Sequence, residues 1–236
     1  MSTMTRQPRI NIWGYNTIAK QILSPVILGA VLFALAGTTD WVWGWVFNIL
    51  HVLVWLGMTI ALAAWNPELL NARGKRGEGT KSWDMVLLGI YGMSWIALIV
   101  VAGLDYRYGW TTNFPTFLAW DGCLLMIVGF VLTTWSMVVN RNFEPTVRLQ
   151  DDREHHVIRS GPYAYVRHPG YVGVMISFFL GMPLVLNSYV ALIPALIGAV
   201  VMMIRTAMED RTLQAELPGY KAYAEDVRFR LAPGLW

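Results

Sequence analysis

Long uncharged stretches, each bounded by charged residues, recur along the chain and dominate its pattern of hydrophobic and polar positions. The first four hold 19, 27, 20 and 19 residues, and they lie between Lys20 and Asp40, Asp40 and Glu68, Asp84 and Asp105, and Asp121 and Arg141. A helix needs about 20 mainly apolar residues to cross the hydrocarbon core of a bilayer. Each stretch therefore predicts one membrane-spanning helix.

A fifth stretch, between Arg167 and Arg205, holds 37 uncharged residues. As one helix it would be about 55 Å long against a hydrocarbon core of about 30 Å, so it must fold back on itself. Residues typical of a turn lie near its middle, at Met182, Pro183, Asn187 and Ser188. We expect two helices of about 16 residues each, and hence an all-α fold, a polytopic membrane bundle of about six spans whose last two form a helical hairpin.

The composition agrees with a membrane protein. Hydrophobic residues make up 56% of the 236 residues and charged residues 14%, against about 25% charged in soluble domains. The single cysteine, Cys123, lies inside an apolar run, which excludes a secreted disulfide scaffold.

The positions of the basic residues predict the orientation in the membrane, because Lys and Arg concentrate in cytoplasmic loops. In a six-span arrangement seventeen of the 18 fall on one side and only Arg107 on the other. We therefore expect both termini in the cytoplasm, and the basic pI of about 9.1 reflects topology rather than binding of nucleic acid. A cleaved signal peptide ending near Ala34, Leu35 and Ala36 is the competing interpretation, but the basic region before it is long and the apolar stretch fills a whole span.

Residues 1–139 contain about four spans and little identifiable chemistry. Gly74, Gly77 and Gly79 lie among basic residues but lack the spacing of a phosphate-binding loop, so a basic loop at the lipid headgroups is favoured. Asp121 lies near the outer end of the fourth span, where an acid is either a functional candidate or an interfacial residue.

Residues 140–171, with the sequence NRNFEPTVRLQDDREHHVIRSGPYAYVRHPGY, form the most informative segment. They predict a cytoplasmic loop of about 30 residues, longer than a connection requires, and such loops are usually functional. Aromatic and β-branched residues alternate with glycine and proline turns, which favours a folded lid over disorder. His155 and His156 lie near Asp151 and Asp152, but the spacing matches no common metal motif, so we expect no metal.

These residues carry a resemblance to a known family. The pattern His155-His156-Val157-Ile158, Gly161-Pro162-Tyr163, Arg167-His168-Pro169-Gly170-Tyr171, then a helical hairpin, Arg205 and the acidic pair Glu209-Asp210, resembles the isoprenylcysteine carboxyl methyltransferases. These are integral membrane enzymes that use S-adenosylmethionine and are related to the phospholipid methyltransferases. The resemblance covers about 90 residues and implies a catalytic region at residues 140–236, behind a membrane part at 1–139.

The resemblance also implies roles for individual residues. Arg205 is implied to bind the substrate and to be catalytic, and the second acid of the family's usual Glu-Glu pair is Asp210 here. The residues implied to bind the cofactor are Gln150, His155, His156, Val157, Ile158, Gly161, Tyr163, His168, Pro169, Gly170, Tyr171 and Glu209. Without the resemblance, Arg205 would be interpreted as a stop-transfer charge at the end of the last span or as the ion-pair partner of Glu209 on one helix. Arg167 is interpreted as a structural or lipid-facing residue.

The residue types suit this cofactor, whose amine, carboxylate, ribose, adenine and sulfonium must each find a partner. A histidine can donate to the carboxylate, Glu209 can accept from the amine or the ribose, and tyrosines offer both a hydroxyl and an aromatic face. No GxGxxG motif follows a strand, so the loop and the C-terminal tail would have to hold the cofactor.

The sulfonium is already activated, so the enzyme chiefly has to desolvate a nucleophile and align it with the methyl carbon. We expect a methyltransferase with a lipophilic, membrane-partitioned substrate, most simply an isoprenylcysteine-like carboxylate, which is ionised at neutral pH and needs no general base. Two alternatives remain open: a phospholipid N-methyltransferase or small-thiol S-methyltransferase, and a membrane transporter or scaffold without enzymatic activity. The last would place polar residues inside the bundle, and the spans offer few.

Overall fold

The computed structural model describes residues 9–74, 79–148, 156–234 and 236, and this part of the chain is helical. Its long helices are α1 (Ile12–Ala36), α2 (Val42–Trp65), α4 (Ser82–Tyr108), α5 (Thr116–Val139) and α8 (Leu192–Glu216). Its shorter elements are α3 (Pro67–Arg73), the 3-10 helix η2 (Gly161–Ala164), α6 (Pro169–Val174), the π-helical turn η3 (Met175–Gly181), α7 (Met182–Val185) and α9 (Tyr220–Asp226).

In the described residues, five helices are long and apolar enough to cross a membrane, and residues 169–185 form a shorter apolar helix. Large apolar side chains cover much of the outer surface, for example Val26, Ile60, Met93, Val131 and Leu196. Such a surface requires lipid rather than water around it. The prediction of an all-helical polytopic membrane bundle is confirmed.

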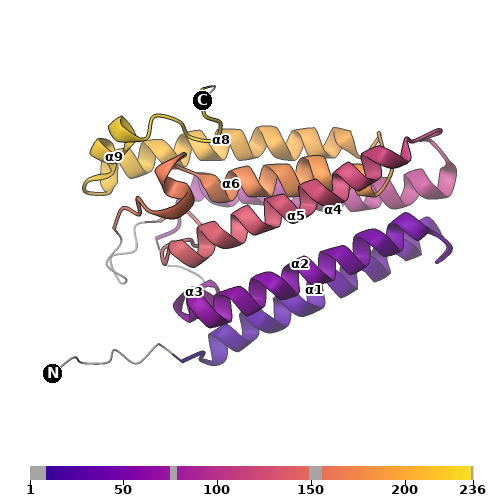
Figure 1. The fold of residues 1–236 in the computed structure, drawn as a ribbon, viewed down its shortest axis with the longest axis horizontal. Helices are drawn as coiled ribbons and strands as arrows, with labels where there is room; N and C mark the ends of the chain where they lie inside the picture. Colours follow the sequence, from indigo (N-terminus) through magenta and orange to yellow (C-terminus); the bar gives the residue numbers. More distant parts are fainter. Residues whose placement is uncertain (1–8, 75–78, 149–155, 235) are drawn as a thin grey trace.

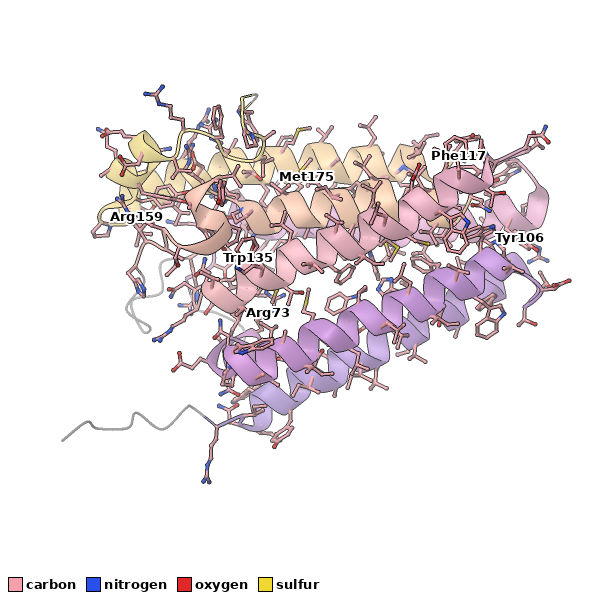
Figure 2. All side chains as sticks on the ribbon, in the orientation of Figure 1. Arg73, Tyr106, Phe117, Trp135, Arg159 and Met175 are labelled. Carbon is pink, nitrogen blue, oxygen red and sulfur yellow. The ribbon has the colours of Figure 1, made fainter. Side chains whose placement is uncertain are left out.

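The helices run roughly parallel to one long axis, with α1 and α2 forming one layer and α4, α5, α6 and α8 the other (Figure 1). The short helices α3 and α9 lie at one end of this axis. Figure 2 labels Tyr106 and Phe117 at the opposite end. The segment that precedes α6 lies at the same end as α9 (Figure 1).

The predicted hairpin is present, but its second helix is longer than expected. Asn187 and Ser188 lie in the turn, as expected, whereas Met182 and Pro183 lie inside the first helical arm. The second arm, α8, has 25 residues rather than about 16 and continues past Arg205. A charged side chain does not end a helix when it is paired inside the protein, and Arg205 is paired in this way.

Four glycines allow the first arm of the hairpin to pack closely on α5. A methyl group added to Gly129 would lie 2.5 Å from the carbonyl oxygen of Gly173, and one added to Gly173 would lie 2.4 Å from that of Gly129. Gly122 and Gly181 form a similar pair nearer the other end of the two helices. Small residues permit such close backbone approach between membrane helices. This glycine seam fixes the position of α6, which begins at the candidate site.

Candidate functional site

A polar cavity lies where the segment after α5, η2, α6, α8 and α9 meet. It has about 740 Å³ of empty space, part of it open to solvent. The predicted cofactor residues that line it are His156, Val157, Ile158, Tyr163, His168, Gly170, Tyr171 and Glu209. The structure thus brings together eight of the predicted cofactor residues, which come from four separate segments of the chain.

The other predicted residues have different positions. Gln150 and His155 fall outside the described residues. Gly161 adopts a left-handed backbone with φ of 60°, which favours glycine, and it starts the 3-10 turn that carries Tyr163. Pro169 is buried at the first position of α6, and its fixed φ and missing N–H suit a helix start.

Glu209 and Tyr171 form the acidic wall of the cavity. The Tyr171 hydroxyl donates to Glu209 Oε2 at 2.6 Å and accepts a hydrogen bond from the Arg205 guanidinium. The imidazole of His168 stacks on the Tyr171 ring, with ring centroids 5.6 Å apart and planes 4° from parallel. An acidic oxygen and two flat rings therefore face the same space.

Arg205 lies behind this wall and is 2% exposed. Its Nε donates to Asp84 Oδ1 at 2.7 Å, and its Nη2 donates to the Pro145 carbonyl at 2.9 Å. Its Nη1 donates to Tyr171 and lies 3.6 Å from Glu209 Oε2. All three guanidinium nitrogens thus have partners within the protein.

Asp84 is a central residue of the site that the sequence pattern did not reveal. It lies in the first turn of α4, is fully buried, and accepts hydrogen bonds from Arg205 and from the Val147 backbone N–H at 2.7 Å. In the sequence it resembles a charge that marks the start of a span. Only folding shows that it joins α4, α8 and the loop after α5.

Asp210, the second acid of the pair, holds the C-terminal tail against the bundle. It is fully buried and accepts two hydrogen bonds from Arg167, at 2.7 and 2.9 Å, and one from Arg230 at 2.9 Å. Tyr220 and Gln214 also donate to it. Arg167 further donates to the carbonyls of residues 227 and 228, so its contacts are structural rather than lipid-facing.

Three tyrosines close the cavity beside α9. Tyr163 accepts from the Asn140 side chain at 3.0 Å, and the Tyr223 hydroxyl donates to the Tyr163 carbonyl at 2.7 Å. Burial raises the pKa of Tyr163, Tyr220 and Tyr223 well above the ordinary value for a phenol. These hydroxyls therefore stay protonated and act as hydrogen-bond donors or as walls, not as bases.

Two apolar spaces adjoin the polar cavity. The inner cavity, with about 880 Å³ of empty space on the same measure as the polar cavity, lies between α2, α4, α5 and the first hairpin arm, and it shares Phe143 with the polar cavity. The lateral groove, with about 800 Å³ of empty space that includes open surroundings, lies between α2 and α5, and it shares Met58 and Phe130 with the inner cavity. The three spaces thus form a series from the outer apolar surface of α2 and α5 to the polar cavity.

The model of the isoprenylcysteine carboxyl methyltransferase (ICMT) family matches residues 122–215, which include α5, η2, the hairpin and most of the cavity wall. Over residues 122–215 the chain is therefore similar to this family. The match begins earlier than residue 140, where the sequence pattern predicts the catalytic region to start, so that boundary stays a prediction.

Individual proteins also resemble the chain. Two probable protein-S-isoprenylcysteine O-methyltransferases of Oryza sativa, from subspecies indica and japonica, are each 33% identical to it over 61 residues. The match spans 25% of this chain and 32% of each rice protein, so it covers about a third of their length.

A solved structure extends the likeness to the rest of the fold. It is the structure of a eukaryotic intramembrane Ras methyltransferase, an isoprenylcysteine carboxyl methyltransferase, with 16% sequence identity and a TM-score of 0.54. The likeness covers 89% of this chain and 74% of that one. The first helices, which lie outside the family match, therefore belong to the same overall fold.

Beyond Asp84, the structure adds cavity residues that the sequence pattern did not single out. Asn140, Asn142, Glu144 and Arg148 line the polar cavity from the loop after α5. Glu144 and Arg148 form a bidentate ion pair at 2.8 and 2.9 Å. The sequence feature that could have identified these residues is their position at the start of the long predicted loop at residues 140–171.

Proposed function

We propose that this chain is an S-adenosylmethionine-dependent methyltransferase that acts on the carboxylate of a lipophilic, membrane-partitioned acid such as an isoprenylcysteine. The observation that carries the proposal is that the polar cavity and the inner apolar cavity are neighbours that share Phe143 as a lining residue. A polar donor and an apolar acceptor chain require two such spaces that meet where the methyl group is transferred.

The polar cavity fits the chemical groups of the cofactor. Glu209 offers a carboxylate oxygen for an amine or for ribose hydroxyls, and Tyr171 and His168 offer aromatic faces for the adenine or the sulfonium. Asn140 and His156 add polar groups at the same wall. The bound cofactor would supply the activated methyl group, and the protein would hold it and exclude water.

The apolar spaces fit a lipid-like acceptor. The lateral groove is bounded by Val54, Trp65 and Val131, and the inner cavity by Trp55, Trp95 and Phe178. An isoprenyl chain transferred from the bilayer into these spaces keeps an apolar environment throughout. A small soluble substrate has no use for them, which favours a membrane-partitioned acceptor.

The test is to incubate the purified protein with methyl-labelled S-adenosylmethionine, a membrane lipid extract and N-acetyl-S-farnesylcysteine. We expect label in the farnesylcysteine fraction, as a methyl ester. Label in phosphatidylethanolamine would indicate an amine acceptor, and label in a small thioether would indicate a thiol acceptor. Either result would contradict a carboxylate acceptor. No transferred label with any of these acceptors would reject the proposal.

A further inference from the structure

Arg73 is a basic residue at the junction of the two cavities that neither the family match nor the sequence motifs include. It is the last residue of α3, and its side chain lines the inner apolar cavity. Its Nη1 donates to the carbonyl of Phe143, the residue that both cavities share. Figure 2 labels Arg73 in the same half of the molecule as Trp135 and Arg159, toward the end that carries the polar cavity.

The charge of Arg73 is poorly compensated within the described residues. Its only hydrogen bond there is the one to Phe143, and it makes no ion pair with any described carboxylate. The carboxylate that acts on it electrostatically, Glu144, is already bidentate with Arg148. Burial lowers the pKa of Arg73 to about 10, and this effect outweighs the opposing influence of Tyr171 and Glu144.

A guanidinium in this position selects for a particular ligand. Most walls of the inner cavity are apolar, so the ligand's body must be apolar as well. Among the residues that the structure describes, the other N–H groups of Arg73 have no hydrogen-bond acceptor, so they can donate as a planar fork, which matches a carboxylate in geometry and charge. A neutral lipid would fill the cavity but leave the cation unpaired.

We propose that Arg73 binds the carboxylate of the lipophilic acceptor, with the acceptor's chain in the inner apolar cavity. The inference rests on the proposed function and names the residue that selects an acid. Arg205, the residue implied by the resemblance, has all three guanidinium nitrogens engaged with Asp84, Tyr171, Glu209 and Pro145. Arg73 is therefore the better placed of the two arginines to receive an anion.

This assignment also predicts that the methylated product is released more readily than the acid. During transfer the carboxylate oxygen forms a bond to the methyl carbon while the bond from that carbon to the sulfonium sulfur breaks. The carboxylate becomes a neutral ester, the sulfonium becomes a neutral thioether, and no proton is released. The ester no longer pairs with the guanidinium, so Arg73 retains the acid and not its methylated product.

The test measures equilibrium binding of N-acetyl-S-farnesylcysteine and of its neutral carboxamide to detergent-purified protein, without S-adenosylmethionine. The parent protein should bind the acid roughly 10-fold or more tightly than the amide. Arg73→Gln should bring the two affinities within about 3-fold of each other while the amide affinity changes little. The control is Arg141→Gln, because Arg141 is exposed and lines neither cavity, and this variant should keep the parent's preference.

A second variant protects the test against misfolding. Arg73→Lys retains the charge but loses the fork, so its preference for the acid should fall at least about 3-fold. The inference is overturned if the parent binds acid and amide equally, or if both Arg73 variants keep the parent's preference. This binding test does not measure methyl transfer. If the parent prefers the acid through Arg73 but the labelling experiment shows no methyl transfer, the proposed function is rejected and the role of Arg73 in binding stands.

Discussion

At the scale of single residues, Glu209 is the group on which cofactor binding depends most directly. Glu209→Gln keeps an oxygen that can accept from Tyr171 but loses the negative charge. A hydrogen bond to a charged group contributes about 1.5–3 kcal/mol, so the affinity for S-adenosylmethionine should fall roughly 10-fold to 150-fold. Titration of the cofactor against the purified variant checks this.

Glu216→Gln is the matched control, because Glu216 is on the same helix but forms a partly exposed ion pair with Lys81. It should bind the cofactor like the parent. An unchanged affinity in Glu209→Gln would remove Glu209 from the cofactor site.

Asp84 is expected to act through Arg205 rather than on the substrate itself. Removing one partner of a buried ion pair leaves an uncompensated charge, at a cost of about 3–5 kcal/mol. Asp84→Asn should therefore lower the thermal unfolding midpoint in detergent and disorder the Tyr171–Glu209 wall. The exposed Asp40→Asn should leave the midpoint unchanged; equal midpoints for both variants would contradict this role for Asp84.

The cavity residues show how far the sequence alone could predict the site. His168, Tyr171 and Glu209 could be predicted to belong to the site, because they stand in the sequence pattern that resembles the family. His168 and Tyr171 are in its loop motif, and Glu209 is in the acidic pair after the hairpin. Asp84 and Arg73 could not, because each lies far from the pattern in sequence and reaches the site only through tertiary packing. A lone acid or base beside a span is indistinguishable in sequence from a residue at the membrane boundary.

At the scale of helices, the glycine seam holds α6 in register with α5. Gly129→Val would place methyl groups against the carbonyl of Gly173, and overpacking of this kind usually costs about 1–3 kcal/mol. Since α6 carries Gly170 and Tyr171 into the cavity, we expect loss of thermal stability together with loss of cofactor affinity. Gly89→Val, whose added carbon meets open space within α4, should affect neither. Equal effects of the two substitutions would contradict the seam.

The hairpin shows what charge spacing predicts and what it does not. The length of the uncharged stretch required a reversal, and the reversal is present at Asn187 and Ser188. The length of α8 was predicted as about 16 residues, whereas the helix has 25 and continues past Arg205, where the uncharged stretch ends. Burial against Asp84 lets the helix continue through that charge.

At the scale of the whole molecule, the distribution of basic residues predicts an orientation. In the six-span arrangement expected from the sequence, seventeen of 18 fall on one side, so tags at Met1 and Trp236 should both report the cytoplasm. Protease added from outside intact cells should not cleave the loop at residues 140–171. Cleavage there would contradict the orientation.

The proposed function and the role of Arg73 both require that the acceptor is a carboxylate. The most direct measurement is the base lability of the label transferred from methyl-labelled S-adenosylmethionine to N-acetyl-S-farnesylcysteine, with the carboxamide as the matched non-acceptor. Mild alkali hydrolyses a methyl ester but leaves methylamines and thioethers intact. We predict base-labile label on the acid and none on the amide; base-stable label, or equal labelling of acid and amide, would contradict the account.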